Sequence, residues 1–271
     1  MNSRILNNKE DTYATESMKV AVFPRLFPSL TFYLKATAIV LKASRAAARG
    51  QYDMKRWCRD SQDIINAIET VGGRMHIEGL DNFRSLNGPC VIVANHMSTL
   101  ETFALPSILQ PIRDVTFVVK RSLTEYPVFK HVMRATNPIT VTRENPREDL
   151  RTVFEEGTRL ISEGRSIIIF PQTTRTVNFD PEHFNTIGAK LAARAGVPIV
   201  PIALYTAFWS NGRLLKDYGA VYPERKIRFS IGKPLHVEGK GNREHRKSVD
   251  FIKGKLDTWA QEDERQEALS K

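Results

Sequence analysis

Short apolar runs alternate with longer segments of helical periodicity from Arg74 onward. Continuous apolar runs are typical of strands that are buried on both faces. Their alternation with helical patterns predicts an α/β fold with a mostly parallel central sheet flanked by helices. The predicted strands span residues 75–78, 90–94, 115–119, 139–141, 166–170, 199–204 and 226–231. The predicted helices span 100–109, 149–163 and 184–195, and a last helix places Val249, Ile252, Leu256 and Trp259 on one face.

The chain before this domain has a different pattern. Residues 26–48 are apolar but contain Lys35, Lys42 and Arg45, so no uninterrupted run approaches the roughly 20 residues of a membrane-spanning helix. These cations share one stripe of a helix, and a second periodic segment follows Gly50. We therefore expect residues 18–73 to form an amphipathic helical hairpin. Two interpretations are open: an anchor in the membrane interface, or a hairpin packed on its own domain with a solvated basic face.

Charge narrows the choice of partner. The formal net charge is +10, and residues 17–59 carry nine basic residues against one acidic residue, Asp53. Such an excess predicts an anionic partner: nucleic acid, a phospholipid surface or a phosphorylated substrate. Nucleic acid is disfavoured because the cations lie on an apolar helix without aromatic stacking platforms. An anionic membrane surface is therefore a candidate partner.

The hydrophobic content, the number of cysteines and the polar ends of the sequence indicate how the chain is divided into domains. With 41% hydrophobic and 26% charged residues, the chain has enough apolar material for a core. Its two cysteines are too few for a disulfide framework, which fits a reducing compartment. Residues 1–17 lack the apolar core of a secretory signal and are expected to be a polar tail, as are residues 261–271. The main domain is then predicted to span 74–260.

One strand end carries a candidate acid–base pair. Asn95 and His96 follow the apolar run 90–94, and Glu101 lies five residues after the histidine. In one interpretation His96 precedes the next helix and folds back to Glu101, which makes it a general base with a fixed tautomer. In the other, Ser98 and Glu101 form a capping box and His96 is an ordinary turn residue. Backbone donors at this helix start are also a candidate oxyanion site.

Several segments resemble the motifs of the glycerolipid acyltransferase family, which includes bacterial 1-acylglycerol-3-phosphate acyltransferases. The run VIVANHMSTLE is similar to the family's N-H-x-x-x-x-D motif, with Glu101 in the place of the aspartate. NPITVTREN resembles the second motif, which ends in arginine, here Arg143. IIIFPQTTR is similar to F-P-E-G-T-R, except that Gln172 and Thr173 replace glutamate and glycine. AGVPIVPIAL resembles a fourth family segment.

The resemblance implies a function and a set of roles. It implies transfer of a fatty acyl group from acyl-CoA or acyl-carrier protein to a hydroxyl of a lysophospholipid such as 1-acylglycerol 3-phosphate. The reaction that the resemblance implies requires no metal and no cofactor beyond the acyl donor. His96 and Glu101 would be catalytic. Substrate-binding roles would fall to Asn95, Lys120, Arg143, Gln172, Thr173, Thr174 and Arg175, with the cationic residues on the acceptor's phosphate.

A membrane-resident acceptor also makes the anchor the favoured interpretation of the hairpin. The protein is then expected at the cytoplasmic face of the membrane, as a peripheral or monotopic protein. The departures at Glu101, Gln172 and Thr173 leave two alternatives: a non-catalytic peripheral lipid-binding protein, or an acyltransferase for another lysolipid such as an amino-acid lipid. Arg143 has its own alternative as a surface residue pairing with Glu144 or Glu148.

Overall fold

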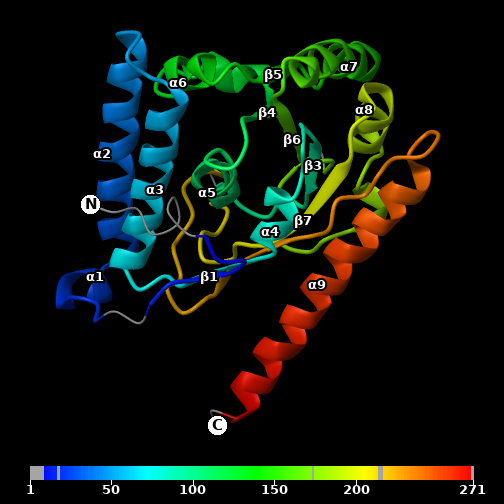
Figure 1. Ribbon diagram of the computed structural model, residues 1–271. Coiled ribbons are helices and arrows are strands. Elements are labelled where there is room, and N and C mark those ends of the chain that lie inside the picture. Colours follow the sequence, from blue (N-terminus) through cyan, green and yellow to red (C-terminus); the bar gives the residue numbers. More distant parts are fainter. Residues whose placement is uncertain (1–8, 17–18, 173, 213–215, 270–271) are drawn as a thin grey trace.

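A central sheet organises the molecule. The computed structural model describes residues 9–16, 19–172, 174–212 and 216–269. In this part of the chain eight strands form one sheet in the order β1-β2-β8-β7-β3-β6-β4-β5 (Figure 1). The strands are β1 (Tyr13–Ala14), β2 (Met75–Glu78), β3 (Val91–Ala94), β4 (Val115–Lys120), β5 (Ile139–Val141), β6 (Ser166–Ile169), β7 (Ile199–Tyr205) and β8 (Ile227–Ile231).

The sheet is mostly parallel, as predicted. Strands β7, β3, β6, β4 and β5 run in one direction, whereas β8 pairs antiparallel with β7. Strand β2 is parallel to β8, and β1 is antiparallel to β2. The carboxyl ends of the five parallel strands therefore share one edge of the sheet, where α/β proteins usually bind their ligands.

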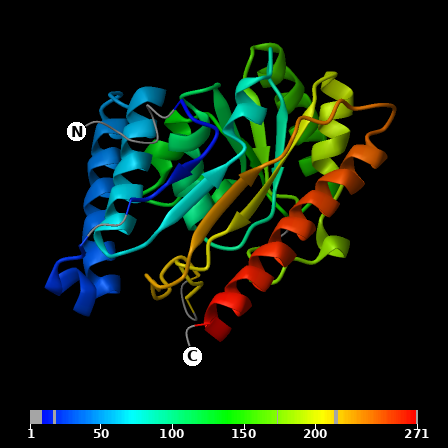
Figure 2. The same cartoon turned by 60° about the horizontal axis from the view of Figure 1, so that its bottom comes forward.

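Helices cover both faces of the sheet (Figures 1 and 2). In β3, Ile92 and Ala94 belong to the core cluster that includes residues of helices α3 (Met54–Thr70) and α5 (Leu100–Leu109). Val91 and Val93 belong to the cluster that includes residues of helices α7 (Pro146–Ser162), α8 (Ile187–Ala195) and α9 (Asn242–Leu269). This alternation explains why every residue of β3 is buried. The helices are α1 (Val22–Leu26), α2 (Pro28–Ala48), α3 (Met54–Thr70), α4 (Leu80–Arg84), α5 (Leu100–Leu109), α6 (Lys130–Ala135), α7 (Pro146–Ser162), α8 (Ile187–Ala195) and α9 (Asn242–Leu269), with 3-10 turns η1 (Arg121–Thr124) and η2 (Pro181–His183).

The predicted N-terminal hairpin is formed by α2 and α3, which lie side by side on the face of the sheet that α5 also covers (Figure 1). Small side chains of α2, such as Ala36, Ala43 and Ala46, are buried and allow close helix packing. Phe32 inserts against Phe208 and Trp209 of the main domain. One stripe of α2 therefore packs on the protein. No helix within the described residues combines the length and apolar character needed to cross a bilayer.

The two segments expected to be polar tails are more structured than predicted. Tyr13 belongs to β1, and its hydroxyl donates to a carboxylate oxygen of Glu69 (2.9 Å). At the other end, α9 continues to Leu269 because Asp263 accepts hydrogen bonds from Arg228 of β8 at 2.6 and 3.0 Å. Tyr13 is also buried in the core, as a single apolar position, whereas no described residue from Gln261 onward is buried. Neither segment therefore shows a hydrophobic periodicity. The domain boundary at residue 74 stays a prediction.

Replacing Asp263 by asparagine is expected to lower the free energy of unfolding at pH 7 by about 1–3 kcal/mol. The reason is that the Arg228 side chain is only 6% exposed and would lose the closer of its two carboxylate partners, which leaves Glu262 at 3.7 Å. Asp263 itself is 30% exposed, which weakens the pair. Urea denaturation measures this change. As a control, Asp257→Asn on the same helix removes an exposed pair with Lys253 and should change stability by less than about 0.5 kcal/mol.

The same pair gives a pH dependence. Burial raises the pKa of Asp263, but hydrogen bonds from Arg228 and Lys226 outweigh it and hold the pKa below its usual range. Stability from this group is therefore present above the ordinary aspartate pKa of about 3.9 and is lost as the pH falls through the lower pKa of the folded state. The difference between wild type and Asp263→Asn should shrink below about pH 4. A difference that stays constant down to pH 3 contradicts the ionic origin of the effect.

Candidate active site

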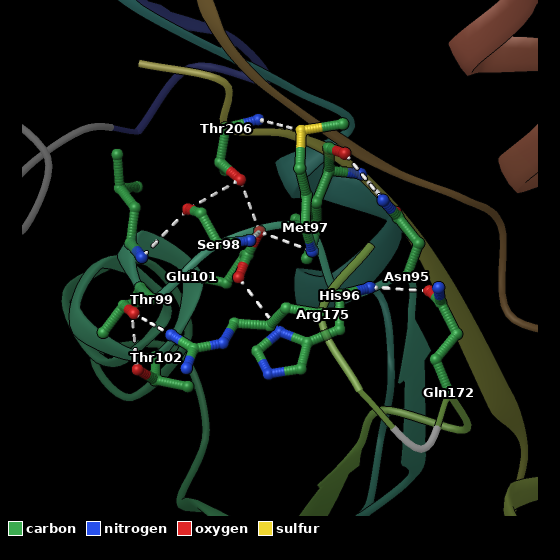
Figure 3. Close-up of polar contacts among 12 residues, drawn as sticks. Asn95, His96, Met97, Ser98, Thr99, Glu101, Thr102, Gln172, Arg175 and Thr206 are labelled. Atoms are coloured by element: carbon green, nitrogen blue, oxygen red, sulfur yellow. Dashed lines mark hydrogen bonds and ion pairs between the residues drawn. The ribbon is translucent and has the colours of Figure 1, made fainter. Parts of the chain in front are cut away.

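Polar side chains gather where three neighbouring parallel strands end (Figure 3). Asn95 and His96 follow β3, Gln172 follows β6 after two residues, and Thr206 follows β7 directly. Strands β6 and β7 are the two neighbours of β3 in the sheet. Helix α5 begins just after this turn and brings Glu101 to the same place.

Glu101 is fully buried and uses its two oxygens differently. Oε1 accepts hydrogen bonds from the backbone N–H groups of Met97 (3.0 Å) and Ser98 (2.8 Å) and from the hydroxyl of Thr206. Oε2 lies 3.1 Å from Nδ1 of His96. The two sequence interpretations are therefore compatible: the carboxylate returns to the helix start and also contacts the histidine. The three donors to Oε1 stabilise the ionised carboxylate in a buried setting.

The His96 ring is held on two sides and open on a third. Its plane stacks on Phe170 with ring centroids 4.3 Å apart, and Nδ1 contacts Glu101. Nε2 lies on the side of the ring away from Glu101 and has no polar partner among the described residues. If Nδ1 carries the proton that it donates to Glu101, Nε2 has a lone pair available for a substrate.

Asn95 and Gln172 are buried and hold this turn in place. Nδ2 of Asn95 donates to the carbonyl oxygen of Leu204, and its Oδ1 accepts from the N–H of the same residue, both at 2.8 Å. Oε1 of Gln172 accepts from the backbone N–H of His96 (2.8 Å), and its Nε2 donates to the hydroxyl of Thr176 (2.7 Å). Asn95 and Gln172, both predicted to bind substrate, here hold the turn that carries His96.

Four backbone N–H groups at and just before the start of α5 are already hydrogen-bonded. The N–H groups of Met97 and Ser98 bind Glu101, and the N–H of Leu100 donates to the hydroxyl of Ser98 (3.1 Å). The N–H of His96 binds Gln172. The turn therefore uses these four groups for its own structure, and the expectation of an oxyanion site at this helix start stays a prediction.

Arg175 lies beside the histidine in the cluster (Figure 3). Its Nη1 donates to the hydroxyl of Thr99 and forms an ion pair with Asp217 Oδ1 at 2.6 Å. The hydroxyl of Thr99 in turn donates to the same carboxylate oxygen at 3.0 Å. The neighbouring Thr174 accepts a hydrogen bond from Lys216 (3.2 Å). Thr173, the other predicted residue of this segment, lies outside the described residues.

Lys120 and Arg143 lie farther along the same sheet edge than His96. Lys120 ends β4, which is separated from β3 by β6, and Arg143 follows β5 at the edge of the sheet. The backbone N–H of Arg143 donates to Asp149 (2.7 Å). Burial raises the pKa of Asp149, but hydrogen bonds from Thr142 and Arg143 lower it below its usual range.

Two residues of the cluster were not predicted. Thr206 directly follows the apolar run of β7, so the rule that identified His96 and Arg143 also points to it. Asp217 lies in the connection between β7 and β8, where no periodicity marks it. Its contact with Arg175 joins residues 42 positions apart in the chain, and only the folded structure reveals it.

Known proteins are similar to most of this chain. A model of the family described as Acyltransferase matches residues 74–205. The chain is 30% identical over 216 residues to a 1-acyl-sn-glycerol-3-phosphate acyltransferase of Pseudomonas aeruginosa, covering 79% of this chain and 77% of that protein. It is 32% identical over 161 residues to the chloroplastic 1-acyl-sn-glycerol-3-phosphate acyltransferase BAT2 of Brassica napus, covering 59% of this chain and 44% of the relative.

A solved structure shows the same fold. The 1-acyl-sn-glycerophosphate (LPA) acyltransferase PlsC from Thermotoga maritima superimposes with a TM-score of 0.63 at 20% identity, covering 88% of this chain and 97% of that one. Together with the sequence matches, the fold and the strand-end site define an acyltransferase. The chain belongs to the glycerolipid acyltransferase family, which confirms the resemblance carried by its motifs.

Proposed function

We propose that this chain transfers a fatty acyl group from acyl-CoA or acyl-carrier protein to a hydroxyl of a lysophospholipid such as 1-acylglycerol 3-phosphate, with His96 as the general base. The observation that carries the proposal is the contact between His96 Nδ1 and the buried Glu101 carboxylate at 3.1 Å. The relatives' names, all 1-acyl-sn-glycerol-3-phosphate acyltransferases, support the substrate class.

The geometry suits a direct transfer. Nε2 of His96 takes the proton from the acceptor hydroxyl as that oxygen attacks the thioester carbonyl. Glu101 holds the ring in the tautomer with the proton on Nδ1 and stabilises the imidazolium that forms. The C–O bond forms, the C–S bond breaks, and the proton on Nε2 passes to the leaving thiolate. No covalent acyl-enzyme is required.

Cations along the sheet edge are placed to bind the acceptor headgroup. Arg175 is the one beside His96, whereas Lys120 and Arg143 end the next strands along the edge. A guanidinium group offers a planar fork of donors that matches phosphate oxygens. We therefore assign Arg175 to the headgroup near the reacting hydroxyl, and Lys120 and Arg143 to more distant phosphate contacts.

An exposed apolar face at the N-terminal end of the hairpin supports binding to a membrane surface. Six large side chains of α1, α2 and the residue between them are more than half exposed: Val22, Phe23, Leu26, Phe27, Leu30 and Leu34. Arg25 and Lys35 lie within the same segment. An apolar face with flanking cations is typical of helices that enter the headgroup layer of anionic membranes. We propose peripheral association of this α1–α2 face with the cytoplasmic face of the membrane.

The double variant Phe23→Ser, Leu26→Ser is expected to weaken partitioning onto anionic liposomes by about 10-fold or more, because it removes two exposed side chains that enter the lipid. Sedimentation with liposomes measures the partitioning. Leu269→Ser is the matched control, since Leu269 is also exposed but lies at the far end of α9. Equal partitioning of the double variant and the control contradicts binding through the α1–α2 face.

The proposed activity is tested with purified protein, two acyl donors and a panel of liposome-presented lysolipids. Formation of a diacyl product from a lysophospholipid is the expected result, and the panel identifies the preferred donor and headgroup. Transfer only to an amino-acid lipid instead identifies a different acceptor class. No transfer to any acceptor, with liposome binding intact, contradicts the proposal and indicates a non-catalytic lipid-binding protein.

A further inference from the structure

The ion pair between Arg175 and Asp217 is built by a dedicated segment of the fold. The connection from β7 to β8 leaves the sheet and contains two short antiparallel segments, around Trp209 and Val221, that hydrogen-bond to each other. The N–H of Ser210 donates to Ala220 (3.1 Å), and that of Tyr222 donates to Phe208 (2.8 Å). At Gly219 a Cβ atom would lie 2.0 Å from the carbonyl oxygen of Ser210, so glycine is required for this close pairing. The pairing of these two segments therefore holds Asp217, which precedes the second one, in its position.

The charge of Arg175 is therefore already compensated within the protein. The Arg175 side chain is 16% exposed, whereas that of Asp217 is 56% exposed, and their atoms approach to 2.6 Å. Thr99 binds both partners and holds the pair at the start of α5. Among the described residues the guanidinium uses only Nη1 for these contacts, so Nε and Nη2 are available for an acceptor headgroup.

A headgroup bound to Nε and Nη2 would lie across the guanidinium from the Asp217 carboxylate, which contacts Nη1, and still close enough for an electrostatic interaction with it. Its attraction to Arg175 and its repulsion from Asp217 both grow with its negative charge, and the repulsion opposes a dianion more than a monoanion. We propose that Asp217 is a specificity-determining residue that lowers the preference of this site for a phosphomonoester dianion relative to a phosphodiester monoanion. This inference rests on the proposed function and names the feature that selects the acceptor's charge.

The test removes the charge but keeps the shape. In Asp217→Asn the side-chain oxygen still accepts from Arg175 and Thr99, whereas the repulsion of the headgroup is lost. Kinetics are compared for lysophosphatidic acid, a phosphomonoester, and lysophosphatidylglycerol, a phosphodiester, with the same acyl chain. The ratio of their kcat/KM values is expected to shift toward the monoester by about 3- to 10-fold at low salt, through KM rather than kcat, and the shift should shrink as salt is added.

Two controls separate charge from structure. Asp217→Glu keeps the charge and should keep the wild-type ratio. Asp257→Asn removes a carboxylate that is equally exposed, at 55%, and pairs with Lys253 away from the site, and it should also leave the ratio unchanged. A ratio that is unchanged in Asp217→Asn, or that moves toward the diester, overturns the inference.

Binding measured without the acyl donor separates this inference from the proposed function. Dissociation constants of the two lysolipids are determined for wild type and Asp217→Asn. The variant should bind the monoester more tightly by a larger factor than the diester, whether or not transfer is detected. If the affinity of both lysolipids rises by the same factor in the variant, or if neither affinity changes, the role of Asp217 is overturned. Selective tightening without transfer supports that role while contradicting the proposed activity.

Discussion

Replacing His96 by alanine is expected to lower kcat for acyl transfer by about 10²- to 10⁴-fold, the usual contribution of a positioned general base. The imidazole Nε2 is the group that the site leaves open toward a substrate, while Nδ1 is bound to Glu101. The loss should fall on kcat, because the proton moves as the hydroxyl attacks. Initial rates of thiol release with a liposome-presented lysophospholipid measure it.

His183 provides a matched control for this variant. It also pairs with a carboxylate through Nδ1, at 2.7 Å from Asp180, but on the exposed surface of η2. His183→Ala is expected to keep wild-type kcat and wild-type liposome binding. If His96→Ala retains more than about a tenth of the wild-type rate, His96 is not the general base.

Replacing Glu101 by glutamine is expected to lower kcat almost as much, by about 10²- to 10⁴-fold. The backbone N–H groups of Met97 and Ser98 require an acceptor, so the carbonyl oxygen of the new amide would take the place of Oε1 and its NH₂ group would face His96. The ring must then accept at Nδ1 and carry its proton on Nε2. In that tautomer it has no lone pair toward the acceptor hydroxyl.

Glu101→Asp separates the effect of the negative charge on kcat from the effect of side-chain length. The aspartate keeps the negative charge found in the family's motif, but it is one methylene shorter than the side chain that here joins His96 to the backbone of Ser98. We expect kcat between those of wild type and Glu101→Gln. Circular dichroism and liposome binding show whether each variant is folded. Glu101→Gln with the activity of Glu101→Asp contradicts the tautomer argument.

Much of the fold can be read from the sequence because buried parallel strands are continuous apolar runs. Strands β2 and β5 and helix α5 lie where the pattern predicts them. Two of the segments that were missed show no apolar periodicity, whereas α4 was missed although its Leu80 and Phe83 are buried. β1 has two residues, and the last turns of α9 are held by Arg228 and Asp263. Such elements need tertiary partners that a local window of sequence does not contain.

The site residues also divide into those that the sequence predicts and those that it does not. The strand-end rule brings Asn95, His96 and Gln172 together, and spacing suggested two uses of Glu101 that the structure shows to be simultaneous. Residues five apart do not share a helix face, and the contact exists because His96 precedes α5. Asp217 could not be predicted, since it reaches Arg175 through a connection with no pattern of its own.

Single-turnover thiol release, with and without acceptor, tests the direct transfer most sharply. Wild-type protein is mixed with an acyl thioester in the absence of acceptor, and then with 1-acylglycerol 3-phosphate in liposomes. Because His96 activates the acceptor hydroxyl itself, thiol should be released only when the acceptor is present, with one diacyl product for each thiol. A burst of thiol equal to the protein concentration without acceptor would reveal a covalent acyl-enzyme and contradict the mechanism.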